Sequence, residues 1–196
     1  MLNKTINYYD TNAKEFVEGT LNVDFKATQD KFINKLPAKG YILDFGCGSG
    51  RDTKYFLDKD FNVEAIDGSI ELCKIASEYT NIKVRHMYFN ELSIVNKYDG
   101  IWACSSILHL SLDDLVDVFK RMSKALKGEG IIYTSFKYGD FSGERNGRFF
   151  TDMTEDSFAK LIANVENLKV EEQWITADVR PQRGNEKWLN LILRKK

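Results

Sequence analysis

The sequence predicts a single α/β domain with a doubly wound, mostly parallel sheet that ends antiparallel. Short apolar runs alternate with amphipathic stretches as far as residue 136, which is typical of a parallel sheet with helices on both faces. The first apolar run ends in a glycine-rich turn, where such sheets commonly bind ligands. The last two apolar runs are joined by only about nine residues, too few for a parallel crossover. We therefore expect these two strands to pair antiparallel.

The apolar patterns place each element along the chain. Strand patterns lie at or near residues 41–45, 61–66, 82–85, 98–104, 130–136, 168–177 and 187–194. Helical patterns lie at 51–59, 69–78, after Ser111 and around 158–162. The Ser111 hydroxyl can cap the helix that follows it, and Gly128 can supply the left-handed residue that ends that helix. Residues 137–150 are expected to form a glycine- and charge-rich loop.

Composition limits the class of partner. The chain has 196 residues, enough for one domain, with 28 Lys and Arg against 29 Asp and Glu. No bulk charge attracts it to DNA or to an anionic membrane. The longest stretch without a charged residue, 100–112, is shorter than the roughly 20 residues of a spanning helix. We expect a small-molecule substrate, no DNA or membrane partner, and a monomer or homodimer.

The cysteines indicate neither a metal site nor a disulfide framework. Cys47, Cys73 and Cys104 form no Cys-x-x-Cys pair, and His86 and His109 are the chain's only histidines. We expect no bound metal. An odd number of scattered thiols suits a reducing compartment, so the expected location is the cytoplasm.

The glycine turn Asp44-Phe45-Gly46-Cys47-Gly48-Ser49-Gly50 favours S-adenosylmethionine over a dinucleotide. The dinucleotide fingerprint needs its third glycine three residues after the second. Arg51 occupies that position, and the third glycine comes early, at Gly50. A carboxylate at Asp44 would repel a pyrophosphate but suits the ammonium and sulfonium groups of S-adenosylmethionine. Backbone N–H groups around Gly48 and Gly50 could take that ligand's carboxylate.

A second carboxylate, Asp67, ends the second predicted strand. It lies 21 residues after Gly46 and could accept both hydroxyls of a ribose. This feature also fits a dinucleotide, so alone it does not discriminate between the two ligands.

These segments resemble class I S-adenosylmethionine-dependent methyltransferases, in particular small bacterial members similar to tellurite-resistance methyltransferases. Residues 42–52 resemble the first motif of that family, and Asp67-Gly68-Ser69 resembles the second. Residues 98–109 resemble the segment around the fourth strand, and Tyr8-Tyr9-Asp10 resembles a lid segment. The resemblance covers nearly the whole chain. It implies a Rossmann-like sheet of seven strands in one domain, residues 1–196, with a lid or helical segment at 1–30.

The resemblance also implies a set of cofactor-binding residues. Asp44, Gly46 and Gly50 would lie against the methionine part, Asp67 against the ribose, and Cys104 near the sulfonium. The full set is Tyr9, Asp44, Phe45, Gly46, Cys47, Gly48, Gly50, Asp67, Gly68, Ser69, Met87, Tyr88, Phe89, Ala103, Cys104 and Ser105. Met87, Tyr88 and Phe89 would flank the adenine. Many relatives carry an aspartate at the position of Tyr88, so here we expect stacking or backbone contacts instead.

The sequence contains fewer signals for the methyl acceptor than for the cofactor, because displacement at a sulfonium mainly requires alignment of the acceptor with the methyl group. Enzymes that methylate amino groups of nucleic acids usually carry Asp/Asn-Pro-Pro-aromatic after the fourth strand, where this chain has Cys104-Ser105-Ser106-Ile107. This difference disfavours a nucleic-acid acceptor.

Two expected loops concentrate arginine near the cofactor. Arg145 and Arg148 follow the fifth strand with Tyr138, and Arg180 and Arg183 join the last two strands. Because arginine suits carboxylate and phosphate, an anionic small molecule is the predicted acceptor. The alternative is that these arginines pair with carboxylates to order the loops, namely Glu144, Asp140, Asp152 or Asp178.

Other assignments remain open between two interpretations. His109 could be a catalytic base or substrate contact, or could make a structural hydrogen bond. Tyr8, Tyr9 and Phe16 could belong to a lid or to a helix packed on the sheet edge. Besides the small-molecule methyltransferase, three functions remain: a non-catalytic S-adenosylmethionine-binding protein, a tRNA or protein methyltransferase, and a nicotinamide-dependent oxidoreductase, which the glycine spacing disfavours.

Overall fold

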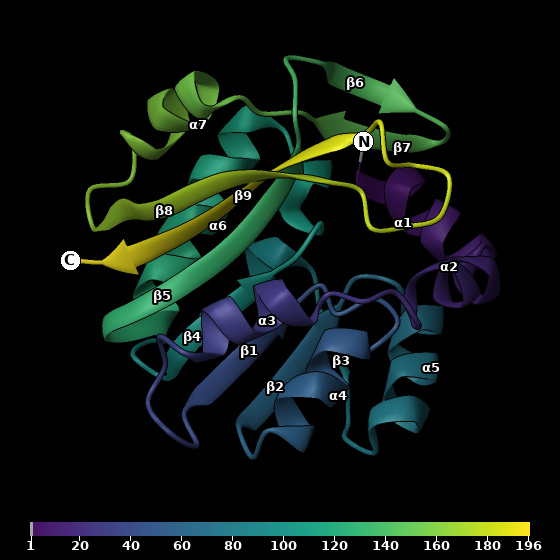
Figure 1. Cartoon of the computed structure of the whole chain (residues 1–196), viewed down its shortest axis with the longest axis horizontal. Helices are drawn as coiled ribbons and strands as arrows, with labels where there is room; N and C mark the ends of the chain where they lie inside the picture. Colours follow the sequence, from purple (N-terminus) through teal and green to yellow (C-terminus); the bar gives the residue numbers. More distant parts are fainter. Residues whose placement is uncertain (1) are drawn as a thin grey trace.

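Seven strands form one sheet in the order β3-β2-β1-β4-β5-β9-β8 in the computed structural model, which describes residues 2–196, with side chains from Lys4 onward (Figure 1). The strands are β1 (Tyr41–Phe45), β2 (Asn62–Asp67), β3 (Arg85–His86), β4 (Tyr98–Ala103), β5 (Leu126–Lys137), β8 (Leu168–Ala177) and β9 (Lys187–Lys195). The first five pair parallel, whereas β9 runs antiparallel to both β5 and β8. The predicted Rossmann-like sheet, with its last strand antiparallel, is confirmed.

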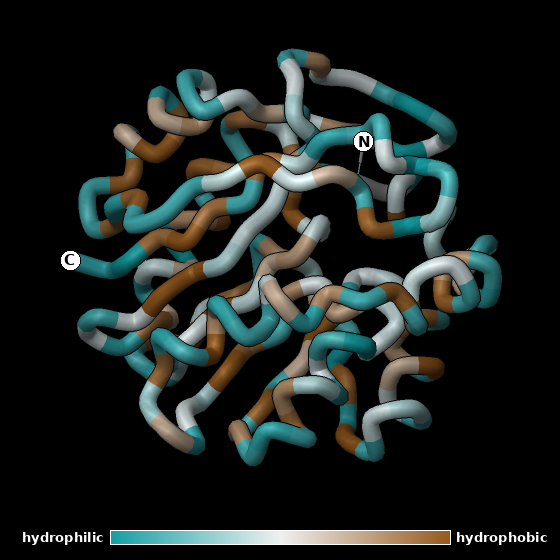
Figure 2. Tube along the Cα trace, viewed as in Figure 1, coloured by the Kyte–Doolittle hydropathy of each residue, from teal (hydrophilic) through white to brown (hydrophobic). Residues whose placement is uncertain are grey.

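Helices cover both faces of the sheet. They are α1 (Leu2–Thr11), α2 (Ala13–Thr20), α3 (Lys26–Ile33), α4 (Arg51–Asp58), α5 (Ile70–Thr80), α6 (Leu112–Ala125) and α7 (Glu155–Ile162), with short turns η1 (Phe89–Glu91) and η2 (Ile107–His109). Because strand side chains alternate between faces, Leu43 packs in the cluster beneath α6 and α7, while Ile42 packs with α3 and α4. Figure 2 shows apolar residues along the central strands and hydrophilic residues in the outer loops.

The end of α6 differs from the prediction. The Ser111 hydroxyl caps the helix by accepting the N–H of Asp114, as expected. The helix stops at Ala125, however, and β5 begins at once because the fully buried Leu126 is extended and enters the core. Gly128 is therefore not the left-handed stop, and the left-handed residue nearby is Glu129, with φ of 62°.

The third strand is shorter and later than residues 82–85. It consists of Arg85–His86. The N–H of Val84 donates to the Ser77 hydroxyl at 3.0 Å, so the preceding chain is held by α5 rather than by β2.

The prediction of an irregular loop at residues 137–150 is wrong. These residues contain a hairpin formed by β6 (Ser142–Arg145) and β7 (Arg148–Thr151). Its two-residue turn is Asn146-Gly147, with both residues left-handed, at φ of 50° and 77°. Asn-Gly is the favoured sequence for this tight hairpin turn.

The three N-terminal helices precede the sheet. The predicted lid or helical segment was residues 1–30. Met1 lies outside the described residues, and residues 2–30 form α1, α2 and most of α3. No helix in residues 2–196 is long and apolar enough to cross a lipid bilayer.

Candidate functional site

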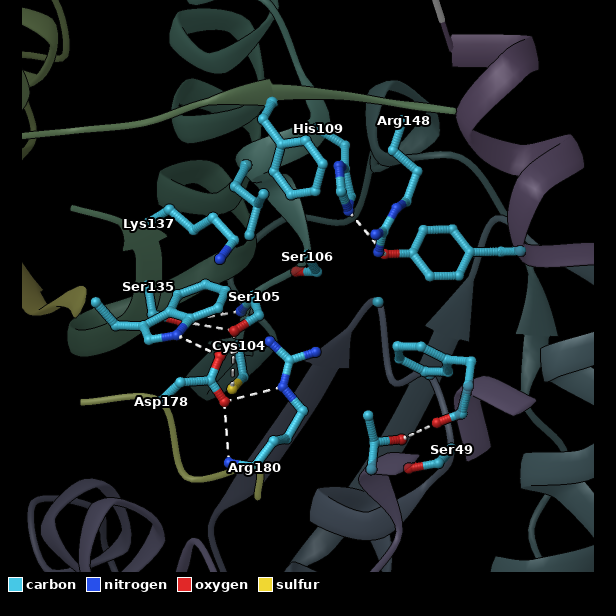
Figure 3. A pocket seen from close by; sticks show the side chains of 18 of the residues that line it. Ser49, Cys104, Ser105, Ser106, His109, Ser135, Lys137, Arg148, Asp178 and Arg180 are labelled. Carbon is cyan, nitrogen blue, oxygen red and sulfur yellow. Dashed lines mark hydrogen bonds and ion pairs between the residues drawn. The ribbon is translucent and has the colours of Figure 1, made fainter. Parts of the chain in front are cut away.

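A cavity of about 650 Å³ opens at the carboxyl edge of the sheet. It lies beside β1 and β4, where the strand order reverses and doubly wound sheets bind ligands. Its walls come from loops after the strands, from α1 and α2, and from the β6–β7 hairpin. Figure 3 shows His109 and Arg148 on one side of the cavity and the Asp178–Arg180 pair on the other.

The glycine turn fits tightly against its neighbours. Gly46 and Gly48 line the cavity with left-handed φ values of 88° and 56°. A Cβ on Gly46 would lie 2.5 Å from the Cβ of Ser106, and one on Gly48 would lie 3.0 Å from the Phe16 ring. The turn therefore has no room for side chains at these positions and presents its backbone to the cavity.

Asp67 is buried at the end of β2 and faces the cavity. Its carboxylate accepts the N–H of Gly48 at 2.9 Å and that of Ser69 at 2.8 Å. Burial raises the pKa of Asp67, while the backbone N–H groups act in the opposite direction. The Gly50 N–H donates to the carbonyl of Cys47 at 3.0 Å. The N–H groups of Gly48 and Gly50 thus already have acceptors within the protein, and the expectation that N–H groups around these glycines take a ligand's carboxylate stays a prediction.

Asp44 lies beneath the turn rather than in the cavity wall. It is buried and accepts the Thr53 hydroxyl at 2.5 Å. Burial, reinforced by the neighbouring Asp52 carboxylate, raises the pKa of Asp44 to about 8. At neutral pH Asp44 is therefore mostly protonated, and it offers a cationic ligand neither a full negative charge nor an exposed oxygen.

The predicted cofactor residues fall into two groups. Those that line the cavity are Tyr9, Gly46, Cys47, Gly48, Asp67, Gly68, Met87, Tyr88, Phe89, Cys104 and Ser105. Those that support it from behind, outside the lining, are Asp44, Phe45, Gly50, Ser69 and Ala103.

Arg51 is a cavity residue that the sequence patterns did not assign. In the sequence analysis Arg51 was only the residue at the position of the third glycine of the dinucleotide fingerprint, yet it lines the cavity. Its guanidinium pairs with Asp52, with Nε 2.7 Å from Oδ1. Asp52 also accepts the Trp102 indole N–H at 2.8 Å. The position of Arg51 at the first turn of α4, directly after the glycines, was the available signal.

All four predicted arginines line the cavity, but three of them are paired. Arg145 pairs with Asp152, Arg180 with Asp178, and Arg183 with Glu186. Arg180 binds Asp178 through two nitrogens, at 2.9 and 2.5 Å. These three contacts agree with the alternative that the arginines pair with carboxylates and so order the loops, although Glu186 was not among the expected partners. Tyr138 also lines the cavity, and its hydroxyl donates to Glu155 at 3.0 Å.

Arg148 differs from the other three. Among the residues that the structure describes, no carboxylate lies within ion-pair distance of it. Its buried Nε has no hydrogen-bond partner, a feature that it shares with Arg145. The guanidinium lies 4.4 Å from the centre of the Tyr8 ring and 5.2 Å from that of Phe150. One terminal nitrogen lies 3.4 Å from the Tyr9 hydroxyl.

Both ring nitrogens of His109 are engaged. Nδ1 lies 2.6 Å from the Phe149 carbonyl oxygen, and Nε2 lies 2.8 Å from the Tyr9 hydroxyl. Burial lowers the pKa of His109 to about 4, so the ring is neutral at pH 7. Because a carbonyl only accepts, Nδ1 carries the proton and Nε2 accepts the Tyr9 hydroxyl. This geometry corresponds to the structural interpretation of His109.

Comparison with known proteins identifies the matched segment. A family model described as "Methyltransferase domain" matches residues 42–130. An uncharacterized methyltransferase of Staphylococcus carnosus is 28% identical, over 78% of this chain and 81% of its own length. YqeM of Bacillus subtilis, also named as a methyltransferase, is 29% identical over 62% of this chain. The match covers 52% of YqeM, so the chain spans about half the length of that relative.

A solved structure shares the fold. The 1,6-didemethyltoxoflavin-N1-methyltransferase of Burkholderia thailandensis, with bound 1,6-didemethyltoxoflavin and S-adenosylhomocysteine, superposes with a TM-score of 0.75. The two chains are 22% identical, and the match covers 97% of this chain and 85% of the other. The segment matched by the family model contains the glycine turn, Asp67 and the loop after β4, the parts that form the cavity's floor. The comparisons thus place a methyltransferase domain at residues 42–130, on a fold that the chain shares with the solved methyltransferase structure.

Proposed function

We propose that this enzyme transfers a methyl group from S-adenosylmethionine to a small molecule that carries a carboxylate or phosphate. The observation that carries this proposal is Arg148, a guanidinium in the cavity wall without a carboxylate partner among the described residues. A charge in this position costs free energy unless it is compensated, and an anionic group of the acceptor would compensate it.

The charge of the surrounding wall supports the same class of acceptor. Away from the glycine turn, the lining contains six cations and three carboxylates. The cations are Lys137, Arg145, Arg148, Arg180, Arg183 and Lys187, and the carboxylates are Asp152, Asp178 and Glu186. This excess of positive charge favours an anionic ligand.

The opposite part of the cavity is suited to the cofactor. Asp67 would accept the ribose hydroxyls, and Tyr88 and Phe89 would lie beside the adenine. Since the Gly48 and Gly50 N–H groups are occupied, we expect the Arg51 guanidinium to meet the carboxylate of the methionine part. When bound, S-adenosylmethionine supplies a methyl group activated by the sulfonium.

The protein's contribution to transfer is alignment and exclusion of water. Tyr9 on α1 and Phe16 on α2 line the cavity, so these helices would act as its lid. Beside Cys104, the hydroxyls of Ser105 and Ser135 lie 3.2 Å apart and could orient the acceptor's nucleophilic atom. We assign no general base, because both nitrogens of His109 are engaged.

The test is a methyl-transfer assay with labelled S-adenosylmethionine. The acceptor panel pairs carboxylates and phosphates with their neutral amides or esters, and includes bulk tRNA and peptides. We expect transfer to an acid and not to its neutral counterpart. Arg148→Ala should raise the KM for that acid at least about tenfold, the effect of one lost charge-assisted contact. The affinity of the Arg148→Ala variant for S-adenosylhomocysteine should stay within about twofold of that of the wild type.

Arg121→Ala is the matched control, because Arg121 pairs with Asp117 on α6, outside the cavity lining. It should leave both constants unchanged. Labelling of tRNA or peptide instead of any acid would contradict the proposal, and silence over the whole panel would favour a non-catalytic binding protein.

A further inference from the structure

Helix α1 touches the cofactor side of the cavity through Asp10. The Asp10 carboxylate accepts the Ser69 hydroxyl at 2.6 Å and the N–H of Glu71 at 3.3 Å, at the beginning of α5. Ser69 in turn donates its N–H to Asp67. The end of α1 is thereby linked through Ser69 to Asp67, which carries the cofactor-facing carboxylate.

The same helix is attached to the hairpin on the acceptor side. The Thr5 hydroxyl accepts the N–H of Phe149 at 3.1 Å, and the Tyr8 ring packs under the Arg148 guanidinium. Lys4 pairs with Glu144 at 3.1 Å. One helix of ten residues therefore contacts both halves of the cavity.

A directed chain of hydrogen bonds joins Arg148 to its own strand. Arg148 can only donate, so the weak contact at 3.4 Å runs from its nitrogen to the Tyr9 oxygen. Tyr9 then donates to Nε2 of His109, and Nδ1–H of His109 donates to the carbonyl of Phe149. The chain starts on β7, passes through α1 and η2, and returns to β7 one residue from its origin.

We propose that Tyr9 and His109 are positioning residues that hold Arg148 toward the cavity, so that α1 couples binding of an anion at Arg148 to binding of the cofactor at Asp67. This inference rests on the proposed anionic acceptor. An anion at Arg148 stabilises the hairpin against α1, and the fixed α1 keeps Asp10 on Ser69 beside the cofactor-facing carboxylate. Coupling of two binding equilibria is reciprocal, so each ligand must tighten the other by the same factor.

The experiment measures the dissociation constant of S-adenosylhomocysteine by calorimetry with and without inorganic phosphate or acetate. Sodium chloride keeps the ionic strength constant. In the wild type, at least one of the two anions should tighten S-adenosylhomocysteine binding about fivefold or more, the lower range of allosteric coupling. Hydrogen exchange should show slower exchange of the α1 amides when both ligands are present.

Tyr9→Phe should abolish the coupling, because it keeps the ring and removes the hydroxyl that joins Arg148 to His109. Tyr8→Phe is the matched control and should keep it. The Tyr8 ring also packs on Arg148, but among the described residues its hydroxyl makes no hydrogen bond. Asp10→Asn is a second variant that weakens the other attachment of α1. It should still bind the anion but should lose the coupling, which keeps the test decisive if Tyr9→Phe does not fold.

The outcomes separate this inference from the proposed function. If an anion binds the wild type and is lost in Arg148→Ala, yet does not change S-adenosylhomocysteine affinity, the coupling is overturned and the anionic acceptor stands. If Tyr9→Phe and Asp10→Asn couple as strongly as the wild type, the positioning role is overturned. If neither anion binds at Arg148, both proposals are overturned.

Discussion

The Asp67 carboxylate accepts the backbone N–H of Gly48 at 2.9 Å. This contact joins the end of β2 to the turn after β1, two segments that are neighbours in the sheet but not in the sequence. One oxygen of Asp67 thus holds the glycine turn, and the other holds Ser69 at the beginning of α5. The position of the carboxylate in the cavity is fixed from both sides.

Replacing this carboxylate should weaken cofactor binding. Asp67→Ala removes the acceptor proposed for the ribose hydroxyls, and we expect the dissociation constant of S-adenosylhomocysteine to rise at least about tenfold. Calorimetric titration measures the change. Glu78→Ala, an exposed position on α5, should leave the affinity unchanged. Equal affinity in wild type and Asp67→Ala would show that Asp67 has no part in the cofactor site.

The close fit of the glycine turn predicts a large effect of one methyl group. Gly46→Ala places a Cβ at 2.5 Å from Ser106 on a residue with φ of 88°. We expect a loss of at least about 2 kcal/mol in the free energy of unfolding, from left-handed strain and the clash. Gly128→Ala has open space around its Cβ and should change stability by less than about 0.5 kcal/mol. Urea unfolding compares the two, and similar values would refute the packing argument.

The Arg180–Asp178 pair should stabilise the fold above pH 4. Burial would raise the pKa of Asp178, but hydrogen bonds from Arg180 and Trp188 outweigh it and hold that pKa at about 2. A folded pKa below the unfolded value of 3.8 gives a stability contribution that is complete above pH 4 and is lost as the pH falls toward 2. Arg180→Ala should therefore cost about 2 kcal/mol at pH 7 and progressively less below pH 4.

The matched control for this pair is Arg183→Ala. Arg183 and Glu186 are each about one third exposed, at 38% and 34% for their side chains. Exposed pairs contribute at most about 1 kcal/mol. Urea unfolding of both variants at pH 7 and pH 3 gives the comparison, and a pH-independent cost in Arg180→Ala would contradict the assigned cause.

The buried His109 should lower the free energy of unfolding in mild acid. Burial holds its pKa at about 4, below the usual 6.5, so between these values the unfolded chain binds more protons than the folded one. Stability should therefore fall as the pH decreases from 6.5 to 4, by about 3 kcal/mol from this residue. His109→Gln should remove this part of the pH dependence. His86→Gln, at an exposed position on β3, should retain it, and identical pH profiles for wild type and His109→Gln would exclude the mechanism.

Sequence patterns correctly predicted several features that depend only on neighbouring residues. The glycine turn, Asp67 at the end of its strand and the Ser111 cap each depend on a few adjacent residues, and the sequence predicted them where they lie. The β6–β7 hairpin was also local, since Asn146-Gly147 is a strong turn signal. It was missed because the abundance of charge and glycine around it favoured an irregular loop.

Long-range partners could not be predicted in the same way. Arg145 and Arg148 are near neighbours in the same hairpin, and nothing in their local sequence distinguishes their roles. Arg145 is paired because Asp152 follows directly after β7, whereas Arg148 contacts Tyr9, which lies 139 residues away in the sequence. The environment of His109 likewise depends on α1 and β7, which only the folded sheet brings together.

The two attachments of α1 also have a kinetic consequence. With α1 as the proposed lid, a spent cofactor and a methylated product would leave only after the contacts of Asp10 or Tyr9 break. We therefore expect opening of the helix, rather than bond formation, to limit the rate of repeated turnover. Under rapid mixing the first equivalent of methylated product should form as a burst, and loosening the helix should raise the steady-state rate while it shortens the residence time of each product.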